Sequence, residues 1–316
     1  MVRQNSLNSA PPHEIPVANS HLDVSVVCAN YNNGPYLDEF FLSFVASTRA
    51  PRELIFVDDG STDNSLAIAQ KFAFRLPFLK IVALERNQGF GNALNVGIEQ
   101  ATCRFIMRID PDDVMLPERI EVQHQILASG AYDIVGSNAE IFHSDTGRVL
   151  GKTNFPLTHD DIAAKIRAGE HGVLHPTVMA RASFFKSQRY VQENVPAEDY
   201  DIFARMLAAG ARFANIDSVL MRYRVHQKSA SNILPFSTIS KTYALRDRIF
   251  NDQTPKMRVW MYFVHIKFYR KYLFESNYPF KVVFLVISSI FYPAKFFSRV
   301  RRMIRTGRDR RGKNDG

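Results

Sequence analysis

The chain contains 316 residues, of which 46% are apolar, and this is enough to bury a sizeable core in one large domain or in one domain with an appendage. Its net charge of +9 is unevenly distributed, because residues 295–316 hold nine Lys and Arg against two Asp, and the rest of the chain carries a net charge of only +2. A nucleic-acid-binding protein would spread basic residues over a face of the fold, so nucleic acid is not an expected partner.

The amino-terminal residues 1–21 are polar and contain three Pro. We expect them to be disordered and to hold no secretory signal, since they lack an apolar run. Cys28 and Cys103 lie in apolar, strand-like runs. We therefore expect both to be buried free thiols in a protein that works in a reducing compartment.

Short apolar runs alternate with segments of helical pattern between residues 24 and 128. The expected strands cover residues 24–28, 53–57, 79–84 and 104–109, and the expected helices cover residues 36–47, 64–75, 91–101 and 117–128. This alternation predicts βαβ units and a Rossmann-like α/β domain with a mostly parallel central sheet. Ligands bind beyond the carboxyl ends of the strands in such sheets, so the residues that follow each strand are the first candidates for a site.

The second half of the chain has a less regular pattern. The expected strands cover residues 173–180, 212–216 and 218–225, a helix is expected over residues 199–209, and the pattern is helical and aromatic from residue 236 onward. We therefore divide the chain into a disordered segment (1–21), a folded α/β domain (22–232) and a carboxyl-terminal helical extension (233–316).

Polar clusters follow the first two expected strands, as Ala29–Gly34 (ANYNNG) and Asp58–Asp63 (DDGSTD). A turn that caps the next helix would account for Ser61–Asp63, but it does not account for two adjacent acids at the end of an apolar strand. Carboxylates in that place accept hydrogen bonds from a nucleobase N–H or from ribose hydroxyls. Asp58 and Asp59 are therefore candidate nucleotide ligands.

Two acidic clusters follow later in the chain. Asp110, Asp112 and Asp113 come directly after the fourth expected strand, where they would repel one another without a cation. Oxygen ligands of this kind suit Mg²⁺ or Mn²⁺, which bridge protein carboxylates to substrate phosphates. The alternative is a solvated acidic turn before a helix. The second cluster, Glu198–Asp201, is a weaker signal, because acids commonly open helices.

Taken together, these stretches resemble the inverting glycosyltransferases of family 2. The matching stretches are, in chain order, VSVVCANYNN, ELIFVDDGSTDNS, ERNQGFGNALNVGIEQA, RFIMRIDPDD, HPTVMARASFF, AEDYDIFARML and YRVHQKSAS. VDDGSTD followed by DPDD at this separation is a specific combination. The resemblance implies the A-type nucleotide-sugar fold, with residues 22–232 as the catalytic domain. It also implies a nucleotide-sugar donor, UDP-linked in the first instance, and a Mn²⁺ or Mg²⁺ ion.

The resemblance also assigns roles to the residues of the first two clusters. It implies that Ala29, Asn30 and Asn32 line the nucleotide pocket and that Asp59 contacts uracil. Asp58 would support the loop that carries Asp59.

Roles for the later clusters follow in the same way. Asp113 would be the principal metal ligand, and Asp110 or Asp112 would contact ribose, with Asp112 as a second candidate metal ligand. Asp199 would be the catalytic base, with Glu198 as its alternative. His226 would reach the metal or the diphosphate, although a packed histidine at a strand end is the competing interpretation. His175 recurs in the family, but the sequence assigns it no chemistry.

Two features bear on the reaction. A single displacement would have Asp199 take the proton of the acceptor hydroxyl, so that the anomeric centre inverts. Processive members carry a Gln-x-x-Arg-Trp motif after the base, whereas the one Trp of this chain, Trp260, lies outside such a motif. We therefore expect one sugar to be added per encounter, as in the bacterial surface-polysaccharide enzymes of the family.

The carboxyl-terminal segment Tyr278–Pro293 is apolar apart from Lys281, and the basic tail follows it. Its uninterrupted stretch is short for a bilayer span. We expect an interfacial helix or a shallow hairpin that holds the protein on the anionic cytoplasmic face of a membrane, as a peripheral or monotopic protein. The alternatives are a helix packed on the catalytic domain with a solvated tail, and a single span with a cytoplasmic tail.

Two other functions compete with the glycosyltransferase interpretation. A nucleotidyltransferase would carry a glycine-rich loop with Arg or Lys near the first strand, whereas this loop is ANYNNG. A non-catalytic saccharide-binding protein would have lost a metal-site acid or the base. The sequence leaves the donor sugar open, and it leaves open whether the acceptor is a saccharide or a lipid-linked intermediate.

Overall fold

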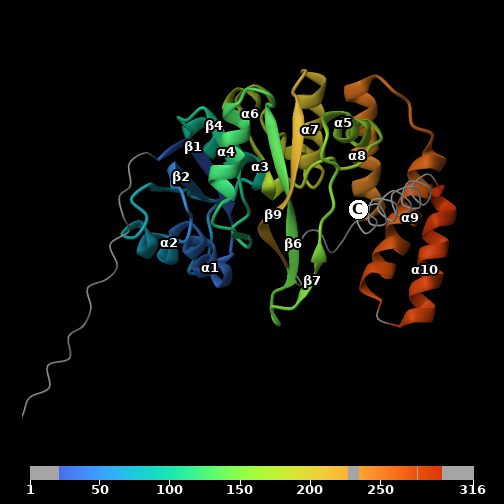
Figure 1. The fold of residues 1–316 in the computed structure, drawn as a ribbon, viewed down its shortest axis with the longest axis horizontal. Coiled ribbons are helices and arrows are strands. Elements are labelled where there is room, and N and C mark those ends of the chain that lie inside the picture. Colours follow the sequence, from blue (N-terminus) through green and yellow to red (C-terminus); the bar gives the residue numbers. More distant parts are fainter. Residues whose placement is uncertain (1–20, 227–234, 276, 294–316) are drawn as a thin grey trace, which may run out of the picture.

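A computed structural model describes residues 21–226, 235–275 and 277–293 of the chain. It forms an α/β domain followed by a group of three helices, α8 to α10 (Figure 1). Apart from residue 21, the segment expected to be disordered lies outside the described residues, as does the basic tail.

The first half of the chain follows the expected alternation of strands and helices. Its elements are β1 (Leu22–Asn30), α1 (Gly34–Val45), β2 (Pro51–Asp58), α2 (Ser65–Ala73), β3 (Leu79–Ala83), α3 (Phe90–Gln100) and β4 (Phe105–Arg108). The four strands are parallel and lie in the order β3-β2-β1-β4. The loops after β1, β2 and β4 therefore meet at one edge of the sheet, as the sequence predicts.

The second half adds strands in both directions. Its elements are β5 (Val114–Met115), α4 (Arg119–Ala128), β6 (Ile134–His143), β7 (Val149–Lys152), α5 (His159–Arg167), the 3₁₀ turn η1 (His175–Thr177), β8 (Met179–Arg181), α6 (Ala182–Gln188), the 3₁₀ turn η2 (Gln192–Asn194), α7 (Glu198–Ala208) and β9 (Phe213–Val225). The full order is β3-β2-β1-β4-β8-β6-β9-β5, with β7 beside β6.

The sheet is mixed, so the expectation of a mostly parallel sheet is wrong beyond β4. Strand β8 is antiparallel to both β4 and β6, whereas β6 and β9 are parallel. Parallel neighbours in a sheet need a crossover connection, which is usually a helix, whereas antiparallel neighbours do not. The βαβ pattern therefore does not predict how β8 pairs. The two strands expected over residues 212–225 are one strand, β9, whose register against β6 shifts between Ser137 and Ala139.

Helices cover the two faces of the sheet, and the side chains of β1 alternate between them. Val24, Val26 and Cys28 pack in a core with α1, α2 and α4, and Val27 and Ala29 pack in a second core with α3, α6 and α7. Both faces of the strand are therefore buried, which explains its continuous apolar sequence. Cys28 and Cys103 are buried free cysteines, as expected, and burial raises the pKa of the Cys28 thiol.

Helix α3 lies unusually close to the sheet at Gly97. A Cβ atom at this position would lie 2.6 Å from Cγ1 of Val27 and 3.2 Å from Cγ2 of Val57. The absence of a side chain at Gly97 therefore allows α3 to lie close to strands β1 and β2. The amino-terminal end of α3 faces the carboxyl ends of those strands.

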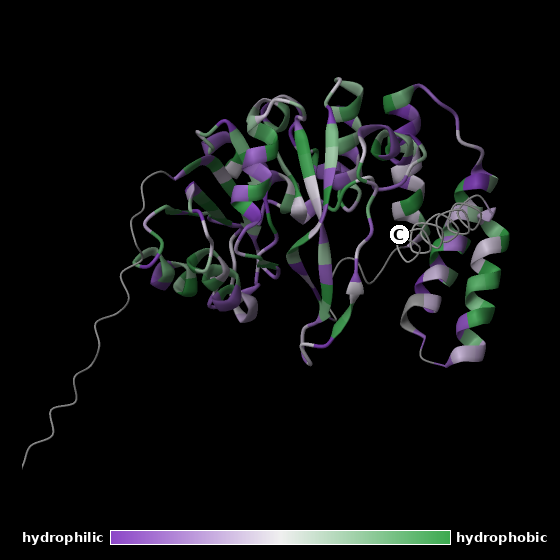
Figure 2. Cartoon of the chain, viewed as in Figure 1, coloured by the Kyte–Doolittle hydropathy of each residue, from purple (hydrophilic) through white to green (hydrophobic). Residues whose placement is uncertain are grey.

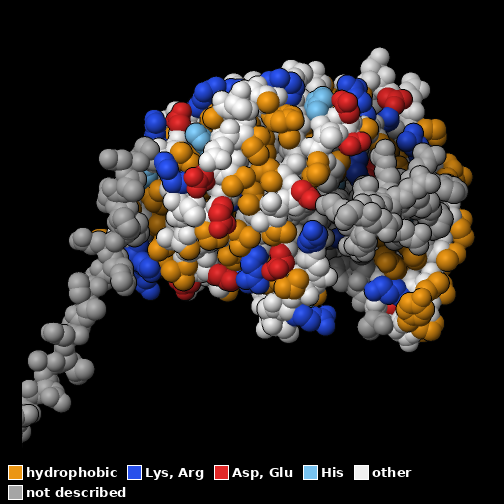
Figure 3. All heavy atoms as spheres, in the orientation of Figure 1, with side chains coloured by type: hydrophobic (Ala, Val, Ile, Leu, Met, Phe, Trp, Pro, Cys, Tyr) orange, Lys and Arg blue, Asp and Glu red, His pale blue; other side chains and the backbone are white. Residues whose placement is uncertain are grey.

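The carboxyl-terminal helices are α8 (Phe236–Phe250), α9 (Lys256–Phe274) and α10 (Tyr278–Phe291). Helices α9 and α10 form an antiparallel hairpin beside the domain (Figure 1). Helix α10 is strongly apolar (Figure 2), yet much of it faces outward. Tyr278 is 76% exposed, and hydrophobic side chains gather over this part of the surface in Figure 3. No helix among the described residues is both long and apolar enough to cross a membrane.

Candidate active site

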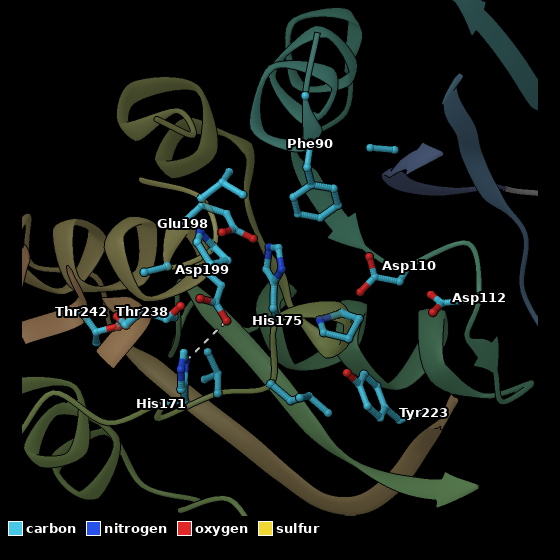
Figure 4. Close-up of a pocket in the computed structure, with 18 of the residues that line it drawn as sticks. Phe90, Asp110, Asp112, His171, His175, Glu198, Asp199, Tyr223, Thr238 and Thr242 are labelled. Atoms are coloured by element: carbon cyan, nitrogen blue, oxygen red, sulfur yellow. Dashed lines mark hydrogen bonds and ion pairs between the residues drawn. The ribbon is translucent and has the colours of Figure 1, made fainter. Parts of the chain in front are cut away.

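A cavity of about 710 Å³ opens at the carboxyl edge of the parallel strands (Figure 4). One part of its wall comes from the loops after β1, β2 and β4, another from α7 and the segment before it, and a third from α8 and α9. The polar and charged residues that line it are Asn30, Tyr31, Asn33, Asp59, Asn87, Asp110, Asp112, His171, His175, Glu198, Asp199, Tyr223, His226, Thr238, Thr242, Tyr243, Tyr262 and Arg270.

Asp59 lies at the end of the cavity where the nucleotide is expected. Its two carboxylate oxygens accept hydrogen bonds from the backbone N–H groups of Gln88 and Gly89, at 2.7 and 2.9 Å. Gly89 has a φ of 92°, which an L side chain rarely adopts, and this conformation belongs to the turn that presents its N–H. The loop before α3 therefore fixes the Asp59 carboxylate while part of it still lines the cavity.

Asn30 and Asp58 support this end of the site from beneath. The Asn30 side-chain amide donates to Asp58 Oδ1 at 2.7 Å, and Ser61 donates to both oxygens of the same carboxylate. Asp58 is buried and does not line the cavity, and its contacts are with Asn30 and with the loop that follows β2. Ala29 and Asn30 do line the cavity.

Asn32 lies elsewhere than the sequence suggests. It adopts the left-handed backbone conformation, with a φ of 56°, and its side-chain oxygen accepts from the backbone N–H groups of Thr62 and Asp63. This side chain does not line the cavity. It joins the loop after β1 to the loop after β2, because the left-handed turn points the amide away from the sheet edge.

The carboxylates of Asp110, Asp112 and Asp113 come together after β4, with one oxygen of each within 4.8 Å of the others. Asp113 is 1% exposed. Its Oδ1 accepts from the backbone N–H of Arg224 at 2.9 Å, and its Oδ2 has no hydrogen-bond partner among the described residues. Burial and the adjacent carboxylates raise the pKa of Asp113 well above its usual range.

The neighbours of this cluster hold two of its members in place. The guanidinium of Arg108 donates to Asp110 at 2.6 Å, and Nε2 of His226 lies 3.0 Å from Oδ2 of Asp112. Burial raises the pKa of Asp110, against the opposing effect of Arg108. The structure therefore brings Asp110, Asp112, Asp113 and His226 together as neighbours.

The three carboxylates fit a divalent cation. They offer hard oxygen ligands close to one another, and Asp113 Oδ2 is a buried oxygen without a described partner. A cation would also relieve the mutual repulsion that raises the pKa values of Asp110 and Asp113.

Glu198 and Asp199 open α7 and point into the opposite side of the cavity (Figure 4). Asp199 Oδ2 lies 3.5 Å from Nδ1 of His171, and Oδ1 accepts from the backbone N–H of Tyr200. Glu198 Oε2 is buried without a hydrogen-bond partner in the described structure. Burial and the neighbouring Asp199 raise the pKa of Glu198 to about 7.

Two histidines were given no role by the sequence. His171 lines the cavity as the partner of Asp199. Nε2 of His175 lies 2.6 Å from the Tyr190 hydroxyl, and burial lowers the pKa of His175 well below its usual range. The contact between His175 and Tyr190 joins the segment before β8 to the loop that follows α6. The signal for His171 was a single His in a loop, and for His175 it was only that a His recurs there in the family.

Arg108 is the clearest residue that sequence reasoning missed. It is buried beneath the cavity, paired with Asp110, and its guanidinium lies 5.1 Å from the ring centre of Phe90. A detectable signal was present, because Arg108 interrupts the otherwise apolar run FIMRI. A charged residue within a buried strand requires a partner, and the adjacent Asp110 supplies it.

Comparison with known proteins identifies the family. Residues 25–189 match glycosyl transferase family 2. The chain is 31% identical to the amylovoran biosynthesis glycosyltransferase AmsE of Erwinia amylovora, over 76% of this chain and 91% of AmsE. It is 28% identical to the O-antigen biosynthesis glycosyltransferase WbnJ of Escherichia coli, over 71% of this chain and 88% of WbnJ.

A solved structure shares the fold. Residues 1–349 of S. aureus TarS, in complex with UDP-GlcNAc, superpose with a TM-score of 0.58 at 20% identity, covering 77% of this chain and 71% of that one. The nucleotide-sugar fold inferred from the motifs is thereby confirmed, with a mixed sheet. The match over residues 25–189 and the similarity to AmsE show that the chain is a glycosyltransferase of family 2.

Proposed function

We propose that this enzyme transfers a sugar from a UDP-sugar to a saccharide or lipid-linked acceptor, with inversion, in the biosynthesis of a surface polysaccharide. The observation that carries the proposal is that the carboxylates of Asp110 and Asp112 face those of Glu198 and Asp199 across one cavity. Asp110 and Asp112 could bind a cation that also binds the donor diphosphate, and Glu198 and Asp199 could remove a proton from the acceptor.

The donor assignment rests on the cavity and on the relatives. Asp59 lines the end where the uracil would lie, with its carboxylate fixed by Gln88 and Gly89. The TarS structure, which shares the fold, holds UDP-GlcNAc. The polysaccharide assignment follows the names of AmsE and WbnJ, which act in amylovoran and O-antigen biosynthesis. Hexose and N-acetylhexosamine donors both fit the proposal.

The carboxylates of Asp110, Asp112 and Asp113 would hold Mn²⁺ or Mg²⁺, with His226 placed to bind the ion or to orient Asp112. When bound, the ion would offset negative charge on the departing diphosphate. The cavity otherwise repels a diphosphate, because most of its charged residues are acids. This excess of acids is the physical reason that a cation belongs to the proposal.

Asp199 is the proposed general base. Its Oδ2 would take the proton of the acceptor hydroxyl as that oxygen bonds to the anomeric carbon and the bond to UDP breaks. His171 holds this carboxylate from the side, and Glu198 is placed to replace it as base when it is ionised. One displacement with no covalent intermediate inverts the anomeric centre.

We also propose that the enzyme works at the cytoplasmic face of a membrane. The exposed apolar side chains of α10 support this, together with the basic sequence that follows the described residues. Apolar burial and attraction to anionic lipid together give stable attachment where either alone is marginal.

The direct experiment measures the hydrolysis of UDP-sugars and GDP-sugars, and their transfer to acceptors, with Mn²⁺, with Mg²⁺ and with EDTA. We expect turnover of a UDP-sugar that EDTA abolishes and added Mn²⁺ or Mg²⁺ restores. Release of pyrophosphate from a nucleoside triphosphate would instead indicate a nucleotidyltransferase. Saccharide binding without turnover of any donor would indicate a non-catalytic protein.

A further inference from the structure

The third part of the cavity wall comes from helices that lie outside residues 25–189, the part of the chain that matches the family. From α9, three lining residues are spaced four apart, namely Tyr262, Ile266 and Arg270. Residues spaced in this way lie on one face of a helix, so these side chains form one ridge. Arg270 lies about 12 Å further along the helix axis than Tyr262, at 1.5 Å per residue.

Arg270 is the single Lys or Arg among the described residues that line the cavity. Within the described part of the chain it forms no hydrogen bond and no ion pair. Burial lowers its pKa, and Tyr223 opposes that shift. An arginine remains charged in proteins, so a partly buried guanidinium of this kind is stabilised by an anionic ligand.

We propose that α8 and α9 form an acceptor subsite in which Arg270 binds the phosphate of a lipid-linked saccharide. This inference rests on the proposed transferase function and specifies its acceptor. The hydroxyl groups of Thr238 and Thr242 lie on the same side of the cavity as Asp199 and His171, with Asp110 and Asp112 on the other (Figure 4). They would contact the acceptor sugar, while Tyr262 and Ile266 separate this region from Arg270.

The arrangement favours a lipid-linked acceptor over the donor diphosphate. The donor diphosphate would be held through a cation at the carboxylates after β4, whereas Arg270 comes from α9, has Tyr223 as its electrostatic neighbour and lies outside the segment that matches the family. Two helix turns between Tyr262 and Arg270 leave room for a short saccharide between the base and a phosphate. Helix α9 then leads into the hairpin whose outer face, on α10, is apolar and exposed. Along the proposed subsite, the acceptor sugar would contact the threonine hydroxyl groups and the acceptor phosphate would contact the Arg270 guanidinium. The hydrocarbon chain would contact the apolar surface of α10.

The test measures the binding of farnesyl diphosphate, farnesol and inorganic pyrophosphate to the full chain, with saturating UDP and Mn²⁺ so that the donor site is filled. We expect farnesyl diphosphate to bind the wild type at least tenfold more tightly than either other probe. Arg270→Gln should weaken that binding at least tenfold, and Arg270→Lys should restore part of it, because Lys supplies charge without the guanidinium fork. Lys267→Gln, which removes an exposed charge from the same helix, is the matched control and should change nothing.

Each other outcome overturns a defined part of the inference. Unchanged binding of farnesyl diphosphate by Arg270→Gln removes Arg270 from the subsite. A tenfold loss of UDP affinity in Arg270→Gln assigns the residue to the donor diphosphate instead. If pyrophosphate binds as tightly as farnesyl diphosphate, the hydrocarbon chain adds nothing to binding, and the acceptor is not lipid-linked. If the wild type fails to bind UDP at all, the proposed function fails, which is distinct from failure of the subsite alone.

Discussion

Single carboxylates in this site differ sharply in their surroundings, although they are close in sequence. Asp112 reaches the cavity and pairs with His226, whereas Asp113 is buried behind it and retains one oxygen without a described partner. Asp199 is partly exposed beside His171, whereas Glu198 is withdrawn from water. These differences lead to a separate prediction for each residue.

Asp113→Asn should abolish the metal dependence of UDP binding. The amide keeps the size of the side chain and can still accept from the backbone N–H of Arg224, but it removes the negative charge that a cation requires. Calorimetry should give the variant the same UDP affinity in Mn²⁺ as in EDTA. A variant that keeps the wild-type response to Mn²⁺ would exclude Asp113 from the ion site.

Asp199→Asn should lower kcat by about 10²–10⁴-fold, the usual contribution of a general base, and leave UDP affinity nearly unchanged. His171→Ala should lower kcat less, because His171 only holds the carboxylate in place. Steady-state kinetics with calorimetry of UDP binding tests both. A loss below tenfold in Asp199→Asn would move the role of base to Glu198.

Glu198→Gln should change how stability depends on pH. The pKa of Glu198 is raised from 4.5 to about 7 in the folded protein, so the unfolded chain loses this proton first as pH rises. The free energy of unfolding of the wild type therefore falls between pH 4.5 and pH 7, and it falls no further through Glu198 above pH 7. At pH 8 the variant should be more stable than the wild type by up to about 3 kcal/mol.

Urea unfolding at pH 4.5 and pH 8 measures this difference. At pH 4.5 the folded wild type carries a neutral Glu198, so the two proteins should be nearly equal in free energy of unfolding. An equal difference at both pH values would show that Glu198 is not held protonated by burial.

At the scale of elements, the close contact between α3 and the sheet at Gly97 helps to position the site. Gly97→Ala should destabilise the fold by about 1–3 kcal/mol, because the new methyl group would overlap Val27. Val27→Ala alone leaves a cavity, but in the double variant it should recover part of the loss. Urea unfolding of the four proteins gives the coupling energy, and strictly additive effects would contradict the close approach.

The first half of the fold could be predicted from the sequence because its signals are local. Each strand from β1 to β4 is a short apolar run followed by a helical segment, so order and direction follow from adjacent elements. The second half depends on distant pairing. Strand β8 has three residues, and β6 pairs in parallel with β9 across about 80 positions of the chain. No local pattern specifies either pairing.

The candidate site likewise contains residues that could be predicted from local sequence and residues that could not. The acids after β2 and β4 were predicted because runs of carboxylates at the ends of apolar strands are unusual and visible in the sequence. Asn32 was misplaced because its left-handed conformation turns the amide toward Thr62. His171 and Arg270 are single polar residues in unremarkable surroundings, and only the packing of distant elements brings them to the cavity.

At the scale of the whole molecule, α9 and α10 place an apolar surface beside the catalytic domain. The exposed residues on α10 include Val283, Val286 and Ile290, spaced as one helical stripe. A water-soluble monomer rarely leaves so continuous a stripe uncovered. The basic segment 295–316 follows it in the sequence.

The full chain should therefore sediment with anionic vesicles and be released in part by high salt, since each Lys or Arg near such a surface contributes about 1 kcal/mol. Val283→Glu with Ile290→Glu should weaken binding at least tenfold. Val149→Glu, at an exposed position on β7, is the control. Removing residues 278–316 should abolish sedimentation and preserve UDP binding. Loss of UDP binding on that truncation would show that α10 is instead a structural helix.

Strand β9 connects the interior of the molecule with the carboxylates of the proposed ion site. It begins at Phe213 in the core and ends where the Arg224 N–H holds Asp113 and His226 meets Asp112. Binding of the proposed ion would consequently be linked to unfolding of the sheet, because unfolding β9 separates the members of the cluster. At a hundred times its dissociation constant, an ion bound there adds about 2.7 kcal/mol to the free energy of unfolding. If the proposed cation binds there, it would stabilise the fold, and its removal would destabilise the enzyme as well as stop turnover.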